Sequence, residues 1–310
     1  MTFNKNNIKG SIILSTAALI WGLAFVAQSG LADKVPPFMC NALRSIIAAV
    51  FLLLFWFLTS RKEKSNFFHK DQIKQYLSGG VICGICLAVS VNFQQFGIAA
   101  YESQGANSEA RAGFLTVLYV IMVPLISVFM KKKITMPVWF GVIIALLGIY
   151  MLCFSGGIDG IYLGDLLVLF CAFTFSLHII AVDKYVGLIG GVKLSILQFF
   201  VCAIISFIMS TFFESSSVTV SGIVSAMPQV LYLGIMSSGI AYTLQVVGQK
   251  FAEPTIASIS MSLESVFAAL GGWIISKNAL SVRELIGCSL VFCAIIIAQL
   301  PDFKKKQTSN

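Results

Sequence analysis

The sequence predicts an all-α polytopic membrane protein with ten transmembrane helices, arranged as two inverted repeats of five helices. Of the 310 residues, 58% are hydrophobic and only 11% are charged, whereas about a quarter are charged in soluble domains. Ten apolar segments of about 17–23 residues follow one another, and about 20 residues suffice to span a bilayer. Short segments with period-two alternation, which a membrane β-barrel requires, are absent.

The predicted spans fall into two sets of five. The first set covers residues 11–30, 38–58, 76–98, 112–130 and 138–154. The second set covers residues 162–182, 194–213, 230–247, 255–276 and 282–300. The first span is too long for a signal-peptide core and lacks a convincing cleavage site, so we expect it to be retained. These spans predict repeats at 11–155 and 160–300, with cytoplasmic tails at 1–10 and 301–310.

The distribution of basic residues predicts the orientation of the chain. With the N-terminus in the cytoplasm, 16 of the 21 Lys and Arg residues fall in inner segments and 4 in outer segments, while Arg44 lies within a span. This asymmetry follows the positive-inside rule. We therefore expect a multi-pass protein of the cell membrane with both termini in the cytoplasm. The net charge of +8 reflects this topology and does not indicate a nucleic-acid partner.

The two halves of the chain align with each other at offsets that change only between helices. An offset of 154 residues places Trp21 on Phe175, and an offset of 150 places Gln95 on Gln245. The later spans align at an offset of 146. Because each half holds an odd number of spans, the second half should enter the bilayer upside down. Inverted repeats with a binding site at their interface near the midplane are typical of secondary transporters.

Four stretches carry a resemblance to a known family. They are ALIWG at 18–22, ALR at 42–44, AGFLT at 112–116 with VPL at 123–125, and SLESVFAAL at 262–270. Through them the chain resembles the EamA-type, ten-span branch of the drug/metabolite transporter superfamily over about residues 11–300. The last stretch is similar to the family's Leu-Glu-Pro-Val-Phe-Ala signature, with Ser265 where proline is common. The resemblance implies a basket of helices around a central cavity, with spans five and ten packed outside it.

The resemblance also implies a function. Members of this branch move small polar metabolites, amino acids or amphipathic compounds, and several are exporters, so we expect export of an amino acid or related compound by alternating access. Multidrug efflux is an alternative in the same class. No Walker loop for ATP is present, so the expected driving force is a substrate gradient, the membrane potential, or a coupled proton or other ion. No cofactor and no metal site are expected, the expected partners are a small-molecule substrate and the lipid bilayer, and the sequence leaves monomer and homodimer open.

Two formally charged residues lie well inside the predicted spans, Arg44 and Glu264. A charge in the hydrocarbon costs about 2.5–3.5 kcal/mol on insertion scales, so each should face a cavity or a partner. Arg44 is a candidate to bind a substrate carboxylate or phosphate through its planar fork, or to pair with helix carbonyls or Glu264. Glu264 lies near the midplane and is a candidate coupling residue for a proton, or a packed protonated side chain.

Matched polar side chains in the third and eighth spans are candidate substrate contacts. Gln95 and Gln245 are repeat equivalents, and Asn92 and Tyr242 lie three residues before them, on about the same helix faces. An amide offers donors and acceptors without a charge, although hydrogen bonds between helices are the alternative role. Three aromatic side chains are expected either to line the cavity or to pack, and these are Trp21, Phe175 and Tyr119.

One motif suggests a different class of protein. His178 begins the pattern His-x-x-x-x-Asp, which ends at Asp183 and has the spacing found in glycerolipid acyltransferases. A membrane enzyme of lipid metabolism is therefore the alternative from another class. Such enzymes also need a soluble or interfacial catalytic domain, for which the chain has no room, so we expect a protein that is not an enzyme.

Overall fold

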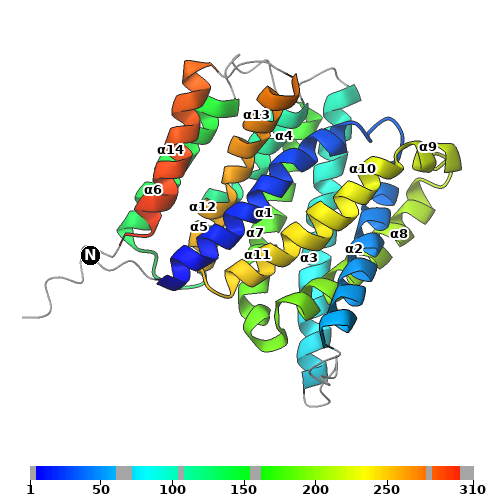
Figure 1. Cartoon of the computed structure of the whole chain (residues 1–310), viewed down its shortest axis with the longest axis horizontal. Coiled ribbons are helices and arrows are strands. Elements are labelled where there is room, and N and C mark those ends of the chain that lie inside the picture. The colour runs from blue at the N-terminus through cyan, green and yellow to red at the C-terminus, as the bar shows by residue number, and fades with distance from the viewer. Residues whose placement is uncertain (1–4, 61–71, 104–107, 154–161, 277–280, 301–310) are drawn as a thin grey trace, which may run out of the picture.

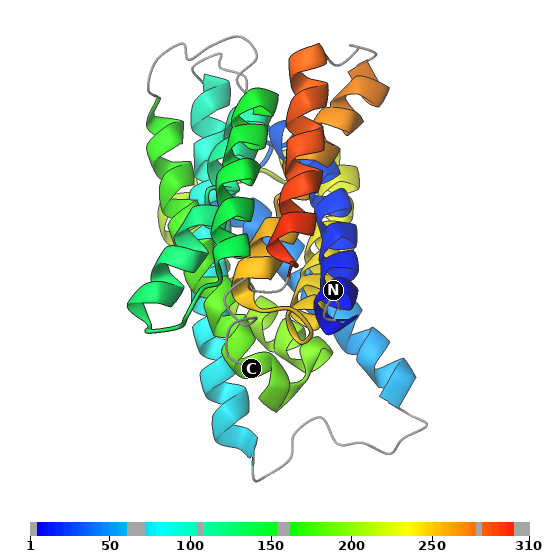
Figure 2. The same ribbon diagram turned by 90° about the vertical axis from the view of Figure 1, so that its left-hand side faces the viewer.

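A computed structural model describes residues 5–60, 72–103, 108–153, 162–276 and 281–300. These residues form a bundle of helices joined by short connections, and no strand occurs within the described ranges (Figure 1). The helices α6 and α14 lie side by side at one edge of the bundle in both ribbon views (Figures 1 and 2). The all-helical class predicted from the sequence is therefore confirmed.

The first half of the chain forms six helices. They are α1 (Lys5–Ser29), α2 (Pro37–Ser60), α3 (Ile73–Ser103), α4 (Ser108–Thr116), α5 (Tyr119–Phe129) and α6 (Met136–Cys153). Helix α1 begins inside the segment 1–10 that was predicted to be a tail. The other predicted tail, 301–310, lies outside the described residues.

The second half begins with two long helices and ends in shorter ones. Its elements are α7 (Leu163–Ile189), α8 (Gly191–Phe213), α9 (Val220–Ser225), α10 (Met227–Tyr232), the π-helix η2 (Leu233–Ala241), α11 (Tyr242–Gln249), α12 (Pro254–Met261), α13 (Leu263–Ser276) and α14 (Val282–Ala298). The stretch from α10 to α11 runs without a break along one direction in Figure 1.

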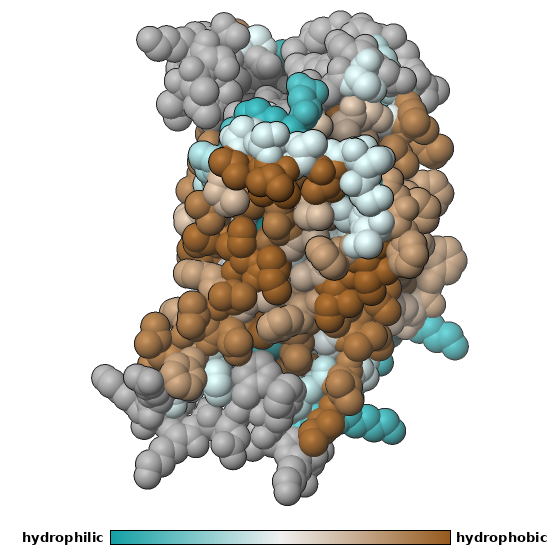
Figure 3. All heavy atoms as spheres, turned by 90° about the vertical axis from the view of Figure 1, so that its right-hand side faces the viewer, coloured by the Kyte–Doolittle hydropathy of each residue, from teal (hydrophilic) through white to brown (hydrophobic). Residues whose placement is uncertain are grey.

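The described residues contain seven helical stretches that are long and apolar enough to cross a membrane. Two shorter apolar helices, Met136–Met151 and Leu285–Ala298, coincide with the fifth and tenth predicted spans. The ninth predicted span, 255–276, is divided into α12 and α13. Figure 3 shows hydrophobic side chains over one outer face of the bundle between paler and more polar ends. These features confirm a polytopic membrane protein, and the count of ten spans stays a prediction.

Two helices of the bundle are interrupted at matching places. Helix α4 ends at Thr116 before α5 begins, and α12 gives way to α13 at Ser262, which is 146 residues after Thr116. The break at Ser262 lies three residues before Ser265, so the helix is interrupted here without a proline. Pro124 lies within α5 and does not mark its boundary. The breaks place the first turns of α5 and α13, and with them Tyr119 and Glu264, inside the bundle.

A glycine allows α1 and α13 to pack closely. A Cβ atom at Gly22 would lie 2.7 Å from the backbone nitrogen of Ala268 and 2.8 Å from the carbonyl oxygen of Glu264. These separations are well below van der Waals contact and involve backbone atoms that cannot rotate away. Small residues at such positions let helix backbones approach closely in membrane proteins. The close approach fixes α1 against the helix that carries Glu264.

Candidate functional site

A cavity lies at the centre of the bundle. Its walls come from α1, α2, α3, α4, α5, α7, η2, α11, α12 and α13, whereas α6 and α14 contribute no residue to its described lining. The cavity has a volume of about 40 Å³. A single water needs about 10–15 Å³ by the same measure, so the space holds roughly three waters. The site is therefore small.

The cavity brings together most of the residues that the sequence predicted as site residues. Seven of the nine line it, namely Trp21, Arg44, Tyr119, Phe175, Tyr242, Gln245 and Glu264. Gln95 and Asn92 are buried but are not part of the lining. The seven come from helices far apart in the sequence, so tertiary packing assembles the site.

Arg44 is held by the π-helix and not by a carboxylate. Its Nε donates to the hydroxyl of Ser238 at 2.9 Å, and one terminal nitrogen donates to the hydroxyl of Ser237 at 3.2 Å. The other terminal nitrogen, Nη1, is buried without a hydrogen-bond partner among the described residues. The side chain is only 3% exposed. Because serine hydroxyls carry no charge, these contacts do not neutralise the guanidinium, which can bind an anion.

The π-helix η2 sets the position of both serines. A π-helix widens the backbone turn, and such segments are frequent at functional sites. Gly234 and Gly239 make close packing possible here, since added Cβ atoms would lie 2.6 Å from Ile47 and 2.9 Å from Phe51. The widened segment thus lies directly against α2, which carries Arg44.

Tyr242 is the centre of an aromatic cluster on the cavity wall. Its ring centroid is 4.7 Å from that of Trp21, 6.3 Å from that of Phe175 and 5.5 Å from that of Phe199. Trp21 also donates its indole N–H to the carbonyl oxygen of Ser237 at 3.2 Å. Aromatic pairs at these separations stabilise one another by about 0.5–1.5 kcal/mol beyond the area they bury. The cluster therefore forms a rigid apolar wall beside Arg44.

Four polar atoms of the cavity lining are buried without a partner among the described residues. They are Arg44 Nη1, the Tyr119 hydroxyl, Gln245 Oε1 and Glu264 Oε1. In folded proteins about nine in ten buried polar groups are hydrogen-bonded. Four unpartnered polar atoms around one small cavity are therefore more than a packed protein interior usually contains. They include a cationic donor and two oxygen acceptors, which suits a polar ligand.

Amide side chains that the sequence analysis missed form another part of the wall. Gln28 lines the cavity, and its Nε2 lies 3.2 Å from Oε1 of both Gln94 and Gln95. Gln94 also lines the cavity and donates to the hydroxyl of Thr116 at 3.2 Å. Gln95 lies behind Gln28 and contacts the site through it. Gln95 was selected because it matches Gln245 in the other half, whereas Gln28 and Gln94 match no amide there; the only signal for them was an amide inside an apolar span.

Asn92 belongs to a hydrogen-bond network between helices. It accepts from Asn41 at 3.0 Å, and its nitrogen lies 2.9 Å from the hydroxyl of Ser206 and 2.7 Å from the carbonyl oxygen of Ala88. These contacts join α2, α3 and α8. Asn92 therefore has the alternative role, that of a hydrogen bond between helices.

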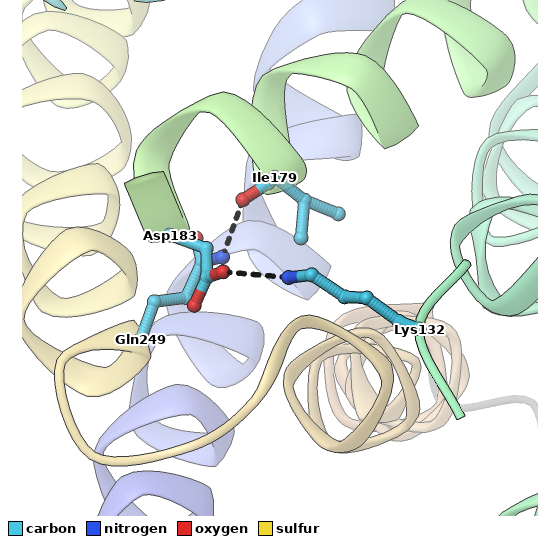
Figure 4. Close-up of polar contacts among 4 residues, drawn as sticks. All are labelled: Lys132, Ile179, Asp183 and Gln249. Atoms are coloured by element: carbon cyan, nitrogen blue, oxygen red, sulfur yellow. Dashed lines mark hydrogen bonds and ion pairs between the residues drawn. The ribbon is translucent and has the colours of Figure 1, made fainter. Parts of the chain in front are cut away.

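Polar contacts join α7 to α11 and to the segment that follows α5 (Figure 4). Gln245 donates to Gln249 at 3.2 Å, and Gln249 donates to the carbonyl oxygen of Ile179, a cavity-lining residue, at 2.8 Å. One helical turn further along α7, Asp183 forms an ion pair with Lys132 at 3.1 Å. The ion pair joins α7 to the segment that follows α5.

The structure gives His178 and Asp183 separate environments. The His178 ring is fully buried, and its Nε2 lies 2.9 Å from Oε1 of Gln198. Asp183 instead contacts Lys132 at the partly exposed end of the helix. The motif therefore does not form a catalytic pair. In the part of the chain that the structure describes, no group of three His, Cys, Asp or Glu side chains could hold a metal ion.

Comparisons with known proteins give one family model, several relatives and a shared fold. The model of the EamA-like transporter family matches residues 8–154 and 162–299. The chain is 28% identical over 293 residues to an uncharacterized transporter of Archaeoglobus fulgidus, covering 93% of this chain and 84% of that protein. It is 22% identical to the uncharacterized transporter YoaV of Bacillus subtilis, covering 96% and 99% of the two chains. A solved crystal structure superposes with a TM-score of 0.74 at 21% identity, covering 96% of this chain and 99% of the other, which shows a shared fold.

Proposed function

Because the chain belongs to the EamA-like transporter family, we propose that it is a secondary carrier that moves a small metabolite across the cell membrane by alternating access. The substrate site is the central cavity. The observation that carries this proposal is the set of four unpartnered polar atoms around one enclosed space. A packed core would have no reason to hold them there, since buried polar groups cost free energy unless they are paired.

The proposed architecture is ten spans in two inverted halves, 11–155 and 160–300, with both termini in the cytoplasm. The helix contacts support it, because exchanging the halves maps the main contacts onto one another. Helix α1 contacts α13 and α11, as α7 contacts α5 and α3, while α6 pairs with α14 and α2 with α8. The breaks after Thr116 and at Ser262 occupy matching positions. Broken helices at the midplane are a recurring feature of carrier binding sites.

The small volume of the cavity supports alternating access. A space of about 40 Å³ holds roughly three waters, which is too little for a metabolite. Substrate entry therefore requires helices at one end to separate while the other end stays closed. The amides of Gln28, Gln94 and Gln95 lie at one side of the cavity, and the contacts of Gln249 and Asp183 lie at the other.

The proposed substrate is an amino acid or a related small polar compound, with export as the favoured direction. Arg44 contacts its anionic group, and the aromatic wall around Tyr242 contacts its apolar part. Glu264 is the proposed site of proton coupling. The uncompensated guanidinium of Arg44 works against cationic drugs, so the geometry favours a metabolite carrier over multidrug efflux.

A binding and transport experiment tests this function. The purified protein is screened by thermal shift against a metabolite panel, and each stabilising compound is tested for counterflow in proteoliposomes. Arg44→Gln is compared with Arg283→Gln, whose side chain lies over the ring of Tyr150 and outside the cavity. We expect wild type and Arg283→Gln to be stabilised and Arg44→Gln not. If none of the stabilising compounds shows counterflow, the protein is not a carrier. If a compound stabilises all three proteins equally, the central cavity is not the substrate site.

A further inference from the structure

The orientation of one cavity amide is fixed by a residue outside the cavity, Gln249. Gln249 lies on α11, one turn after Gln245, and its Nε2 is 2.8 Å from the carbonyl oxygen of Ile179 (Figure 4). The two ends of a glutamine amide look alike, and their assignment depends on the partners. A backbone carbonyl oxygen can only accept, so the end of Gln249 that faces Ile179 must be its nitrogen.

The orientation of the Gln249 amide determines that of Gln245. With its nitrogen bound to Ile179, Gln249 presents its oxygen to Gln245, and the Nε2 of Gln245 lies 3.2 Å from that oxygen. The nitrogen of Gln245 is thus committed away from the cavity, and its oxygen is left without a partner. Gln245 and Gln249 are 2% and 3% exposed. Turning over the amide of Gln245 would break its hydrogen bond to Gln249 and place two acceptor oxygens against each other.

Besides the Tyr119 hydroxyl, which can both donate and accept, the cavity wall holds two unpartnered oxygens of amide or carboxyl groups, and the oxygen of Gln245 is one of them. The other is Oε1 of Glu264, which is 4% exposed. Both residues line the same space of about 40 Å³, which also holds the unpartnered donor Nη1 of Arg44. The wall therefore offers two acceptor oxygens and a cationic donor. A ligand that satisfies all three atoms needs a donor group and an anionic group.

We propose that Gln249 is a positioning residue that holds the Gln245 oxygen toward the cavity, where this oxygen and Glu264 form a subsite for a protonated amine of the substrate. The inference rests on the proposed function, in which the cavity is the substrate site. It specifies the substrate class as zwitterions, with an ammonium group at Gln245 and Glu264 and a carboxylate or phosphate at Arg44. An amine without an anionic group, or an anion without an amine, leaves one part of the wall unsatisfied.

Three substitutions at Gln249 separate positioning from simple packing. Gln249→Glu keeps an acceptor for the Gln245 nitrogen and, as the protonated acid, a donor to Ile179, so it should preserve the orientation of Gln245. Gln249→Met removes both hydrogen bonds at similar length, so the Gln245 amide becomes free to turn over. Gln249→Lys keeps a donor to Ile179 but offers Gln245 no acceptor, which should turn the Gln245 nitrogen toward the cavity. A packing role would give no such order among the three.

The experiment measures binding of three matched probes to the full-length purified protein. Leucine carries both charges, leucinamide only the ammonium group and N-acetylleucine only the carboxylate, and phenylalanine with its two derivatives forms a second series. We expect wild type and Gln249→Glu to bind the amino acid at least tenfold more tightly than either derivative. The preference over the N-acetyl compound should fall severalfold in Gln249→Met and vanish in Gln249→Lys. Gln245→Leu, which keeps the size of the side chain, should also lose it.

The outcomes separate this inference from the proposed function. Wild-type protein that binds an N-acetyl compound or an amide as tightly as the amino acid overturns the inference and leaves the carrier standing. The inference is also overturned if Gln249→Met and Gln245→Leu keep the wild-type preference for the amino acid over its N-acetyl derivative. It is equally overturned if the protein binds other metabolites and none of the probes. By contrast, a protein that binds the amino acids with the expected preferences but catalyses no counterflow in proteoliposomes overturns the carrier function.

Discussion

The guanidinium of Arg44 donates to the hydroxyl of Ser238 at 2.9 Å, across the contact between α2 and the π-helix η2. The second serine contact, to Ser237, comes from the same π-helix. The charge is thus oriented by neutral groups and is available to a ligand.

Replacing both serines should weaken substrate binding without removing the charge. Hydrogen bonds between membrane helices contribute about 0.6 kcal/mol on average and up to about 1.7 kcal/mol. We therefore expect Ser237→Ala with Ser238→Ala to weaken the affinity for the transported compound about threefold to tenfold, measured by titration of the purified protein. Ser289→Ala, an exposed residue of α14 that bonds only its own helix, is the control. An unchanged affinity in the double variant would show that the serines do not orient Arg44.

Gln94 and Gln95 should respond differently to the same substitution. Gln94 lines the cavity, whereas Gln95 is fully buried behind Gln28. We expect Gln94→Ala to raise the KM for transport, and Gln95→Ala to lower the melting temperature with a smaller change in KM. Proteoliposome kinetics and thermal unfolding measure the two effects. If Gln95→Ala has the larger effect on KM, the third helix is turned differently about its axis during transport.

Gly22 should not tolerate a methyl group. The added Cβ would meet the backbone of α13 at 2.7–2.8 Å, while a Cβ at Gly187 would meet nothing within 4 Å. Overpacking of this kind costs about 1–3 kcal/mol. We expect Gly22→Ala to lower the melting temperature by several degrees and Gly187→Ala to leave it nearly unchanged. Similar melting temperatures for the two variants would contradict the close packing of α1 on α13.

The ion pair between Lys132 and Asp183 should limit access to the cavity from this end of the bundle more than it stabilises the fold. Its side chains are 46% and 29% exposed, and exposed pairs contribute about 0.2–1 kcal/mol. We expect Asp183→Asn to leave the melting temperature nearly unchanged and to speed thiol labelling of a cysteine placed at Ile179, in a background without other cysteines. Lys132→Asp combined with Asp183→Lys should restore slow labelling. Labelling at the wild-type rate in Asp183→Asn would show that the pair does not close this end.

The charged part of the candidate site was predictable from the sequence because charge in an apolar helix is costly and therefore conspicuous. Arg44 and Glu264 stand out against their neighbours, and both line the cavity. The aromatic residues Trp21, Phe175 and Tyr242 also line it. The family resemblance is confirmed by the match over both halves of the chain.

The remaining features depend on contacts that a sequence does not display. Gln94 and Gln95 differ by about 100° around their helix, and in helices that are apolar on all sides the pattern does not show which direction faces the cavity. The π-helix depends on close packing of Gly234 and Gly239 against α2. The break at Ser262 occurs without the proline that would have signalled it.

Trp21 gives the site an optical reporter of its own. Its indole ring lies on the cavity wall, in edge contact with Tyr242 and hydrogen-bonded to Ser237. The chain has 4 tryptophans, so three substitutions would leave Trp21 as the single tryptophan, which can be excited selectively over the tyrosines. Its emission would then shift or be quenched when the cavity fills or opens to water, and occupancy could be followed in real time without a label.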